Sequence, residues 1–256
     1  MILCDKHMHT CFCDGKNTPE EMVLAAIDKG LKTVGISGHC NTGFDESYCM
    51  TREVMQRYFD EIHRLKDVYK DKIEILCGIE QDYYAGKPYL PFDYAIGSVH
   101  YVYKNGEYIS VDESAKSLRD NVERLYDGDF YAFAEDYYEI VGDVLNNTGA
   151  DIIGHFDLLT KFNEVDKVFD EEHPRYVNAY KKAVDKLLPY GKPFEVNTGA
   201  ISRGYRTTPY PAFCILQYIK EKGGSVILTS DSHSAENICY QFDKWEKVIK
   251  DFGFEI

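Results

Sequence analysis

Residues 73–100 decide the fold, and they read IEILCGIEQDYYAGKPYLPFDYAIGSVH. This stretch contains two short apolar runs, Ile73–Ile79 and Tyr94–Val99, of the length and composition expected for buried parallel strands. A residue that can bind a metal ion follows each run at once, Glu80 after the first and His100 after the second. The stretch therefore predicts two neighbouring strands whose carboxyl ends carry polar chemistry.

The same unit recurs on both sides of this stretch. Short apolar runs alternate with longer segments of helical periodicity, such as Thr51–Tyr69, which is the pattern of βα units around a mostly parallel sheet. One helix has clear end signals, because Thr18 and Pro19 suit its start and Gly30 suits its end. We expect seven strands, at Ile2–Lys6, Thr33–Ile36, Ile73–Ile79, Tyr94–Val99, Asp151–Ile153, Pro193–Val196 and Ser225–Thr229.

The remaining segments fit around this sheet. A hairpin is expected within Tyr101–Val111, where Asn105-Gly106 suits a tight turn, and two helices are expected within Ser117–Leu145. Further helices are expected at His173–Tyr190, at Pro211–Lys222 and around Trp245. We find no linker or repeat, so the sequence predicts one α/β domain over residues 1–256, a barrel one unit short of the eightfold form.

Composition limits the class of protein and its partners. Of the 256 residues, 44% are hydrophobic and 28% are charged, which is typical of a globular domain. The formal net charge of −14 argues against binding to a nucleic acid polymer or an acidic membrane surface. It does not exclude a small anionic substrate, because bound cations can reverse the local field. No stretch approaches the roughly 20 apolar residues of a membrane span.

Eight cysteines are present, but neither a secretory signal nor a Cys-x-x-Cys pair accompanies them. We therefore expect reduced thiols in a cytoplasmic protein. Cys11 and Cys13 are too close for the usual zinc-knuckle spacing and are interpreted as ordinary loop or core residues.

A residue suited to metal binding or catalysis follows each predicted strand. Six of the eight histidines are at these positions, whereas His63 and His173 fall within or at the start of predicted helices. Active sites of such barrels lie at the carboxyl ends of the strands. The strand-end residues are His7 and His9, His39, Glu80, His100, His155, Glu195 and Asn197, and Asp231 and His233.

Their shared placement predicts a metal site more strongly than any one of them does. His7 and His9, roughly 7 Å apart along an extended strand, suit one ion. A lone strand-end histidine is more often a core or surface residue, and Glu80 alone would be interpreted as a salt-bridge partner of a lysine. Mixed imidazole and carboxylate ligands favour Zn, Mn or Fe over Ca or Mg. More than four ligands predict more than one ion, and paired ions suit phosphate-ester hydrolysis.

In their order along the chain, these motifs resemble the polymerase-and-histidinol-phosphatase (PHP) superfamily. The resemblance covers nearly the whole chain and, by length and by two of the motifs, looks most like the monofunctional histidinol-phosphate phosphatases. It implies a distorted seven-stranded (β/α)7 TIM-like barrel, the PHP fold, with a trinuclear metal centre. The motifs are His7-Met-His9-Thr, Gly35-Ile-Ser-Gly-His39, Gly78-Ile-Glu80, Gly97-Ser-Val-His100, Gly154-His155-Phe-Asp157-Leu, Glu195-Val-Asn197-Thr and Ser230-Asp231-Ser-His233.

Position by position, the resemblance implies two or three divalent ions (Zn, Mn or Fe) with shared ligands. One ion would take His7, His9, Glu80 and Asp231. A second would take Glu80, His100 and His155, and a third would take His39, His233 and Asp14. Many relatives have a histidine near Asp14 or Gly15 and a carboxylate where Gly38 stands, so the third set departs from the common pattern.

The implied reaction is hydrolysis of L-histidinol phosphate to L-histidinol and phosphate, in histidine biosynthesis, by a metal-activated hydroxide. Glu80, Asp231 and His233 would be catalytic, and either Asp231 or His233 could move a proton. Lys161 and Arg203 are the best-placed cations for the phosphate, and Arg206 is a weaker candidate. Glu195 and Asn197 are expected to meet the substrate's amine.

Three other functions remain open at this point. A PHP phosphoesterase acting on another small phosphomonoester or a nucleotide would use the same site. The site of a metal-dependent sugar isomerase or lyase would be richer in carboxylates, so the six strand-end histidines of this chain disfavour that function. A non-catalytic metal-binding module is disfavoured, because seven converging segments leave open coordination positions more readily than a closed structural site does.

Overall fold

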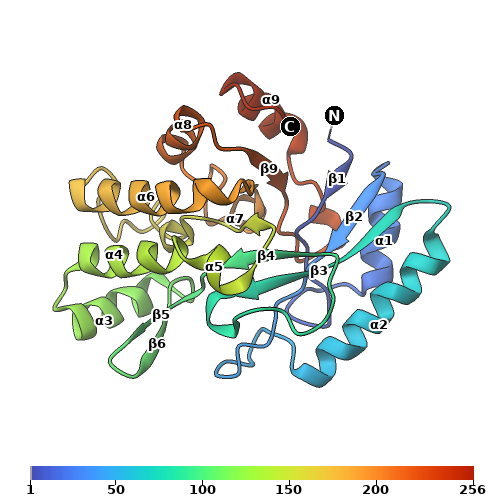
Figure 1. Cartoon of the computed structure of the whole chain (residues 1–256), viewed down its shortest axis with the longest axis horizontal. Coiled ribbons are helices and arrows are strands. Elements are labelled where there is room, and N and C mark those ends of the chain that lie inside the picture. Colours follow the sequence, from blue (N-terminus) through green and yellow to red (C-terminus); the bar gives the residue numbers. More distant parts are fainter. Residues whose placement is uncertain (1) are drawn as a thin grey trace.

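A computed structural model describes residues 2–256, in which seven parallel strands curl into a nearly closed barrel with helices outside it (Figure 1). The strands follow the order β1-β2-β3-β4-β7-β8-β9 around the barrel. This confirms the predicted α/β class with seven parallel strands. The strands are β1 (Cys4–Asp5), β2 (Thr33–Ile36), β3 (Glu74–Asp82), β4 (Tyr94–Ser98), β7 (Ile152–Ile153), β8 (Phe194–Asn197) and β9 (Val226–Thr229).

The barrel closes between the segments that follow β1 and β9. The backbone N–H of His9 donates to the carbonyl of Ser232 over 2.8 Å, and that of Ser232 donates to the carbonyl of His7 over 3.2 Å. Met8 and Ser232 thus form a parallel bridge beyond the ends of the two strands. Since successive side chains of an extended segment point to opposite faces, this closure turns His7 and His9 to the same side.

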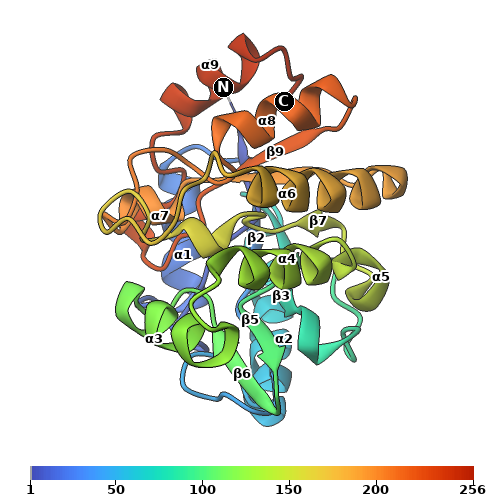
Figure 2. The same cartoon turned by 90° about the vertical axis from the view of Figure 1, so that its left-hand side faces the viewer.

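Helices cover the outside of the barrel, and Figure 2 shows α4 and α6 stacked across one side of it. Thr18 caps α1 in a capping box with Glu21, and Thr51 caps α2, so both predicted helix starts are confirmed. The helices are α1 (Pro19–Asp28), α2 (Arg52–Tyr69), α3 (Ala115–Tyr126), α4 (Phe130–Val141), α5 (Val144–Thr148), α6 (Pro174–Leu187), α7 (Gly199–Ser202), α8 (Phe213–Glu221) and α9 (Phe242–Asp251), with short 3-10 turns at Tyr83–Ala85, Leu158–Thr160, Leu188–Tyr190 and Ala235–Asn237.

One tyrosine ties a helix to the strands that carry the site. Tyr58, on α2, is fully buried, and its hydroxyl donates to the carbonyls of Ile36 (2.6 Å) and Gly78 (2.8 Å). These carbonyls belong to β2 and β3, three residues before His39 and two residues before Glu80. The contact therefore fixes the spacing of two strand ends from outside the barrel.

The predicted hairpin is confirmed, while several boundaries differ from the prediction. Strands β5 (Tyr101–Lys104) and β6 (Glu107–Ser110) pair antiparallel around Asn105 and Gly106, which both have positive φ. Three helices, not two, fill the region after the hairpin. Strand β3 continues past Ile79 to Asp82, because Glu80, Gln81 and Asp82 pair with β4. Glu80 is therefore a strand residue and does not follow the strand.

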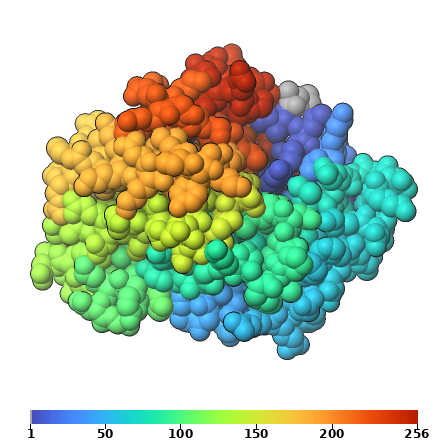
Figure 3. Space-filling model, in the orientation of Figure 1, coloured from blue at the N-terminus to red at the C-terminus, as the bar shows by residue number. Residues whose placement is uncertain are grey.

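The first residues that the structure describes lie beside the last helix, where the backbone N–H of Ile2 donates to Glu246 Oε2 over 3.3 Å. Lys29, at the end of α1, donates to the carbonyl of Ile238 over 2.6 Å, and Figure 3 shows the C-terminal segments beside the N-terminal ones on this face. Within residues 2–256, no helix combines the length and the apolar character needed to cross a membrane.

Candidate metal centre

The carboxyl ends of the strands bring together all nine residues that the sequence predicts as metal ligands. Six separate stretches of chain supply them, and each residue lies inside or just beyond the end of a strand or in the loop after β1. Parallel strands make this possible, because their carboxyl ends meet at one mouth of the barrel. The nine are His7, His9, Asp14, His39, Glu80, His100, His155, Asp231 and His233.

Glu80 lies at the centre of the cluster and is 1% exposed. Its Oε2 atom lies 3.3 Å from His7 Nε2, 3.5 Å from His9 Nε2 and 2.8 Å from His39 Nδ1. Its Oε1 atom lies 3.4 Å from His100 Nε2 and 2.8 Å from His155 Nε2. Five imidazoles thus surround one carboxylate, which is the arrangement required of a ligand shared between ions.

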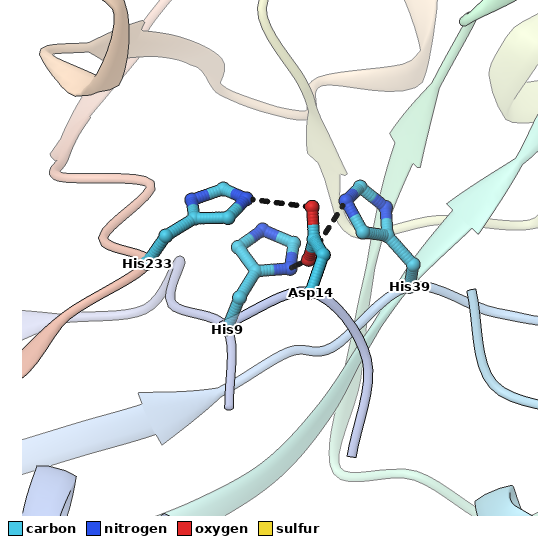
Figure 4. Close-up of side chains that lie close together, drawn as sticks. All are labelled: His9, Asp14, His39 and His233. Atoms are coloured by element: carbon cyan, nitrogen blue, oxygen red, sulfur yellow. Dashed lines mark hydrogen bonds and ion pairs between the residues drawn. The ribbon is translucent and has the colours of Figure 1, made fainter. Parts of the chain in front are cut away.

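A second group lies nearer the surface, where His9, Asp14, His39 and His233 point toward one another (Figure 4). Asp14 Oδ2 is 3.1 Å from His233 Nε2, and its Oδ1 is 3.6 Å from His9 Nδ1 and 3.7 Å from His39 Nε2. The structure places Asp14, the expected ligand from the loop after β1, beside these histidines. It also adds His9 to this group and sets His39 against Glu80 and His100, so the expected ligand sets overlap more than the sequence implied.

Unsatisfied buried atoms show that the inner group suits a cation. Within the described part of the chain, His7 Nε2, His9 Nε2 and Glu80 Oε2 are buried without a hydrogen-bond partner. A buried polar atom without a partner is destabilising, on the order of 1–3 kcal/mol. These three residues offer ligand atoms within 4.8 Å of one another. Their donor chemistry, two imidazoles and a carboxylate, fits a divalent transition-metal ion.

The electrostatics of the cluster point the same way. Although burial lowers the pKa of His7, the carboxylates of Glu195, Glu80 and Asp231 raise it well above its ordinary value. Burial raises the pKa of Glu80, but the surrounding imidazoles, His39 first among them, hold it well below its ordinary value. Burial, reinforced by neighbouring imidazoles, lowers the pKa of His9 to about 3, so this ring stays neutral and keeps a lone pair for a metal ion.

Asp231 reaches the cluster through an uncommon backbone conformation. Its φ of 46° lies in the left-handed region, which aspartate tolerates better than most residues. Its Oδ1 lies 3.2 Å from His9 Nε2, while its Oδ2 accepts from Arg203 Nη2 over 3.0 Å and from the Asn197 amide over 3.2 Å. The turn thus aims one oxygen at the histidines and leaves the other to fixed donors.

Glu195 and Asn197, which are expected from the sequence to meet the substrate's amine, are not part of the cavity lining. Both are 0% exposed. Glu195 Oε1 contacts His7 Nδ1, and its Oε2 accepts from the backbone N–H of His155 over 2.7 Å. The Asn197 amide donates to Glu195 and to Asp231. Both residues lie in β8 with their side chains directed into the barrel, so they hold ligand segments in place.

Sequence reasoning missed Asp82, which follows Glu80 by two residues and faces the same side of β3. Its Oδ2 lies 3.1 Å from His100 Nδ1 and also accepts from the backbone N–H of His100 over 3.2 Å. The signal was the Glu-x-Asp spacing itself. Period-two alternation would have placed both carboxylates on one face, had the strand been extended to residue 82.

A cavity of about 490 Å³ opens onto the cluster. Arg203 and Lys161, the two cations expected to hold the phosphate, both line it. Arg203 Nη1 donates to the carbonyl of Asp231 (2.9 Å) and contacts His233 Nδ1 (2.8 Å), and Lys161 pairs with Asp112 over 2.9 Å. Arg206 instead contacts the Thr160 hydroxyl and is not part of the lining. The lining also includes acids and aromatics, namely Asp45, Asp112, Glu113, Tyr48, Tyr101 and Tyr205.

Fold and site together define a βα-barrel protein with a histidine- and carboxylate-rich centre for divalent metal ions at the carboxyl end of its strands. The sequence model of the PHP domain family matches residues 5–199, which is most of the chain. The chain therefore belongs to the PHP domain family.

Curated relatives and solved structures cover nearly the full length. The chain is 28% identical to a probable histidinol-phosphatase of Deinococcus radiodurans, over 98% of this chain and 94% of the relative. It is 26% identical to the histidinol-phosphatase of Bacillus subtilis, over 93% and 96% respectively. A Lactococcus lactis histidinol phosphate phosphatase, solved with zinc, L-histidinol and phosphate, shares the fold with a TM-score of 0.72 and 24% identity over 98% of this chain and 94% of that one. A Listeria monocytogenes structure has a TM-score of 0.77 at 23% identity, over 94% and 99%.

Proposed function

We propose that this chain is a metal-dependent phosphomonoester hydrolase that converts L-histidinol phosphate and water to L-histidinol and phosphate, a step of histidine biosynthesis. One observation carries the proposal. A single cavity is lined by members of the Glu80-centred cluster, by the cations Arg203 and Lys161, and by acids and aromatic rings. The metal ligands and the two cations suit a phosphate, and the acids and aromatic rings suit a cationic leaving group with a flat ring.

The relatives support the same substrate. Proteins named histidinol-phosphatase match this chain over nearly its full length in Deinococcus radiodurans and Bacillus subtilis. The Lactococcus lactis enzyme, whose structure holds zinc, L-histidinol and phosphate, has the same fold. A phosphomonoester with another leaving group, or a nucleotide, is the alternative that the same site would serve.

For the metals, we propose two or three divalent ions drawn from Zn, Mn and Fe. The inner ligands His7, His9, Glu80 and Asp231 would hold one ion, and Glu80 would share a second ion with His100, His155 and His39. Asp14, His39 and His233 would hold a third, more exposed ion, because the Asp14 side chain is 32% exposed. When bound, such ions lower the pKa of a water molecule and neutralise charge on the phosphoryl oxygens.

The protein's own side chains then bind the phosphate and handle the proton. Arg203 is held by Asp231 and His233 and presents its charge to the cavity, so it would bind a phosphoryl oxygen. Lys161 would supply a second charge from the opposite loop. Asp231 and His233 line the cavity beside Arg203, and we propose that one of them transfers the proton to the leaving oxygen.

The leaving group would lie against the acids and aromatic rings of the lining. Tyr48 and Tyr101 offer ring faces, and Asp45, Asp112 and Glu113 offer negative charge for an amine. Asp112 already forms an ion pair with Lys161. We therefore propose Asp45 and Glu113 as the acids that would contact the amine of a ligand. Tyr101 donates to Asp45 over 2.7 Å, which fixes that carboxylate at the rim.

The test is phosphate release from L-histidinol phosphate by protein reloaded with Zn or Mn. A panel of phosphomonoesters and a chelated sample would be measured in parallel. We expect L-histidinol phosphate to exceed the other esters in kcat/KM by at least about 100-fold, with no turnover after chelation. Metal-dependent turnover that favours another ester would overturn the substrate assignment and leave the metal centre standing.

A further inference from the structure

Two buried carboxylates, Asp82 and Glu195, contact the outer ring nitrogens of two cluster histidines without reaching the cavity. We propose that they are positioning residues, which keep His100 and His7 in the tautomer whose Nδ1 carries the proton and whose Nε2 faces Glu80. This inference rests on the proposed metal-dependent function. Each of the two carboxylates would support a ligand of a different ion. His100 serves the group that contains His39 and Glu80, and His7 serves the group that contains His9 and Glu80.

Asp82 is fixed before it meets His100. It is 2% exposed. Its Oδ1 accepts from the backbone N–H of Tyr84 over 2.8 Å, and its Oδ2 accepts from the backbone N–H of His100 over 3.2 Å. The same Oδ2 lies 3.1 Å from His100 Nδ1, while His100 Nε2 lies 3.4 Å from Glu80 Oε1. A carboxylate offers no donor, so His100 Nδ1 must be the donor, and Nε2 is left free to bind a metal ion.

Glu195 is fixed in the same way below His7. Its Oε1 accepts from the Thr229 hydroxyl over 2.6 Å, and its Oε2 accepts from the His155 backbone N–H over 2.7 Å and from the Asn197 amide over 3.0 Å. The remaining contact of Oε1 is with His7 Nδ1. His7 Nε2 therefore turns to Glu80 Oε2, 3.3 Å away.

Another histidine that turns its Nε2 to Glu80 gives an internal contrast. His155 Nε2 lies 2.8 Å from Glu80 Oε1, yet its Nδ1 has no hydrogen-bond partner among residues 2–256. Buried carboxylates therefore contact the outer nitrogens of His7 and His100 and not that of His155. The outer nitrogen of His9, whose Nε2 also faces Glu80, lies 3.6 Å from the partly exposed Asp14. Hydrogen-bonded partners of this kind fix ring orientation and raise ligand basicity, and their loss weakens metal binding by about 10–100-fold.

Amide substitutions separate positioning from a packing role, because they keep shape and volume. In Asp82→Asn, the side chain has one acceptor oxygen for three N–H groups on two sides. If that oxygen stays with Tyr84, the new amide faces His100 Nδ1 and favours the tautomer whose proton is on Nε2, where the metal ion would bind. Glu195→Gln has the same consequence for His7. Asp93→Asn is the matched control, because Asp93 accepts from the Cys77 N–H and from Lys66 at the opposite end of the barrel.

The experiment titrates Zn and Mn into metal-free wild type and the three variants against a chromophoric chelator, with thermal unfolding of the metal-free proteins alongside. We expect Asp82→Asn and Glu195→Gln each to weaken one ion by about 10–100-fold, with Asp93→Asn binding as wild type does. Wild-type affinity in both site variants would overturn the positioning role. If wild type itself binds no metal, the proposed function fails instead.

Nitrogen-15 NMR of histidine-labelled, zinc-loaded wild type gives a second measurement that needs no variant to fold. The inference predicts protonated Nδ1 and metal-shifted Nε2 signals for His7 and His100. A proton on Nε2 of either ring would contradict it.

Discussion

Arg203 connects phosphate binding to the metal ligands, so Arg203→Ala should impair both. The guanidinium donates to Asp231 Oδ2 over 3.0 Å and to the Asp231 carbonyl over 2.9 Å, and it contacts His233 Nδ1 over 2.8 Å. Its side chain is 27% exposed, while that of Asp231 is 6% exposed. Removal therefore leaves a mostly buried carboxylate without its cation and removes a positive charge from the cavity wall.

The size of the effect follows from these contacts. Hydrogen bonds to charged groups contribute about 1.5–3 kcal/mol each, and breaking a buried ion pair costs about 3–5 kcal/mol. Partial exposure of Arg203 reduces that second figure, so we take about 3–4 kcal/mol for the transition state. Since each 1.36 kcal/mol is a factor of ten, kcat/KM should fall by about 10²–10³-fold.

The assay is steady-state phosphate release, with metal content measured on the same samples. Arg203→Lys keeps the charge and loses the planar fork, so it should lie between wild type and Arg203→Ala. Metal affinity should weaken by a smaller factor than kcat/KM, because His7, His9 and Glu80 remain. Unchanged kcat/KM in Arg203→Ala would refute the role of this side chain in phosphate binding. If the variant loses metal but keeps the wild-type kcat/KM per bound metal ion, Arg203 only holds Asp231 in place.

Three further changes test other parts of the account. Removing the metal ions should lower the melting temperature, because metal at 100 times its Kd adds about 2.7 kcal/mol per ion, or roughly 5–11 °C for a chain of this size; identical melting curves with and without a chelator would contradict a metal centre. Lys161→Met should raise KM about tenfold with unchanged metal content, since Lys161 contacts Asp112 and no predicted ligand; an unchanged KM would remove it from phosphate binding. Tyr58→Phe should lower the free energy of unfolding by about 1–3 kcal/mol in chemical denaturation, because the carbonyls of Ile36 and Gly78 lose a buried donor; a neutral result would show that water replaces the hydroxyl.

The fold was predictable because the strands and the ligands share one pattern. An apolar run followed by a polar residue marks a strand whose carboxyl end opens on the barrel mouth, as at Ile79 and Glu80. The boundaries were less predictable, since pairing with β4 extends β3 to Asp82 and no local signal announces it. The four-residue helix α7 was also missed, because it lacks a side-chain cap and a periodic apolar face.

The residues of the site were predictable from the sequence, but the depth of each residue in the barrel was less so. Eight of the nine expected ligands converge because they lie at strand ends, whereas Asp14, in the loop after β1, was expected only from the family resemblance. Whether a strand-end side chain reaches the cavity depends on depth in the barrel, and Glu195 and Asn197 are fully buried below it. The left-handed turn at Asp231 also lies outside what composition or spacing can indicate.

The most direct test of the central claim is anomalous diffraction from crystals of the zinc-loaded protein. The account predicts a peak bounded by His7, His9 and Glu80, at about 2.0–2.2 Å from their ligand atoms, and a second peak on the side of Glu80 that faces His100. Full zinc loading with no anomalous peak touching Glu80 would contradict the account.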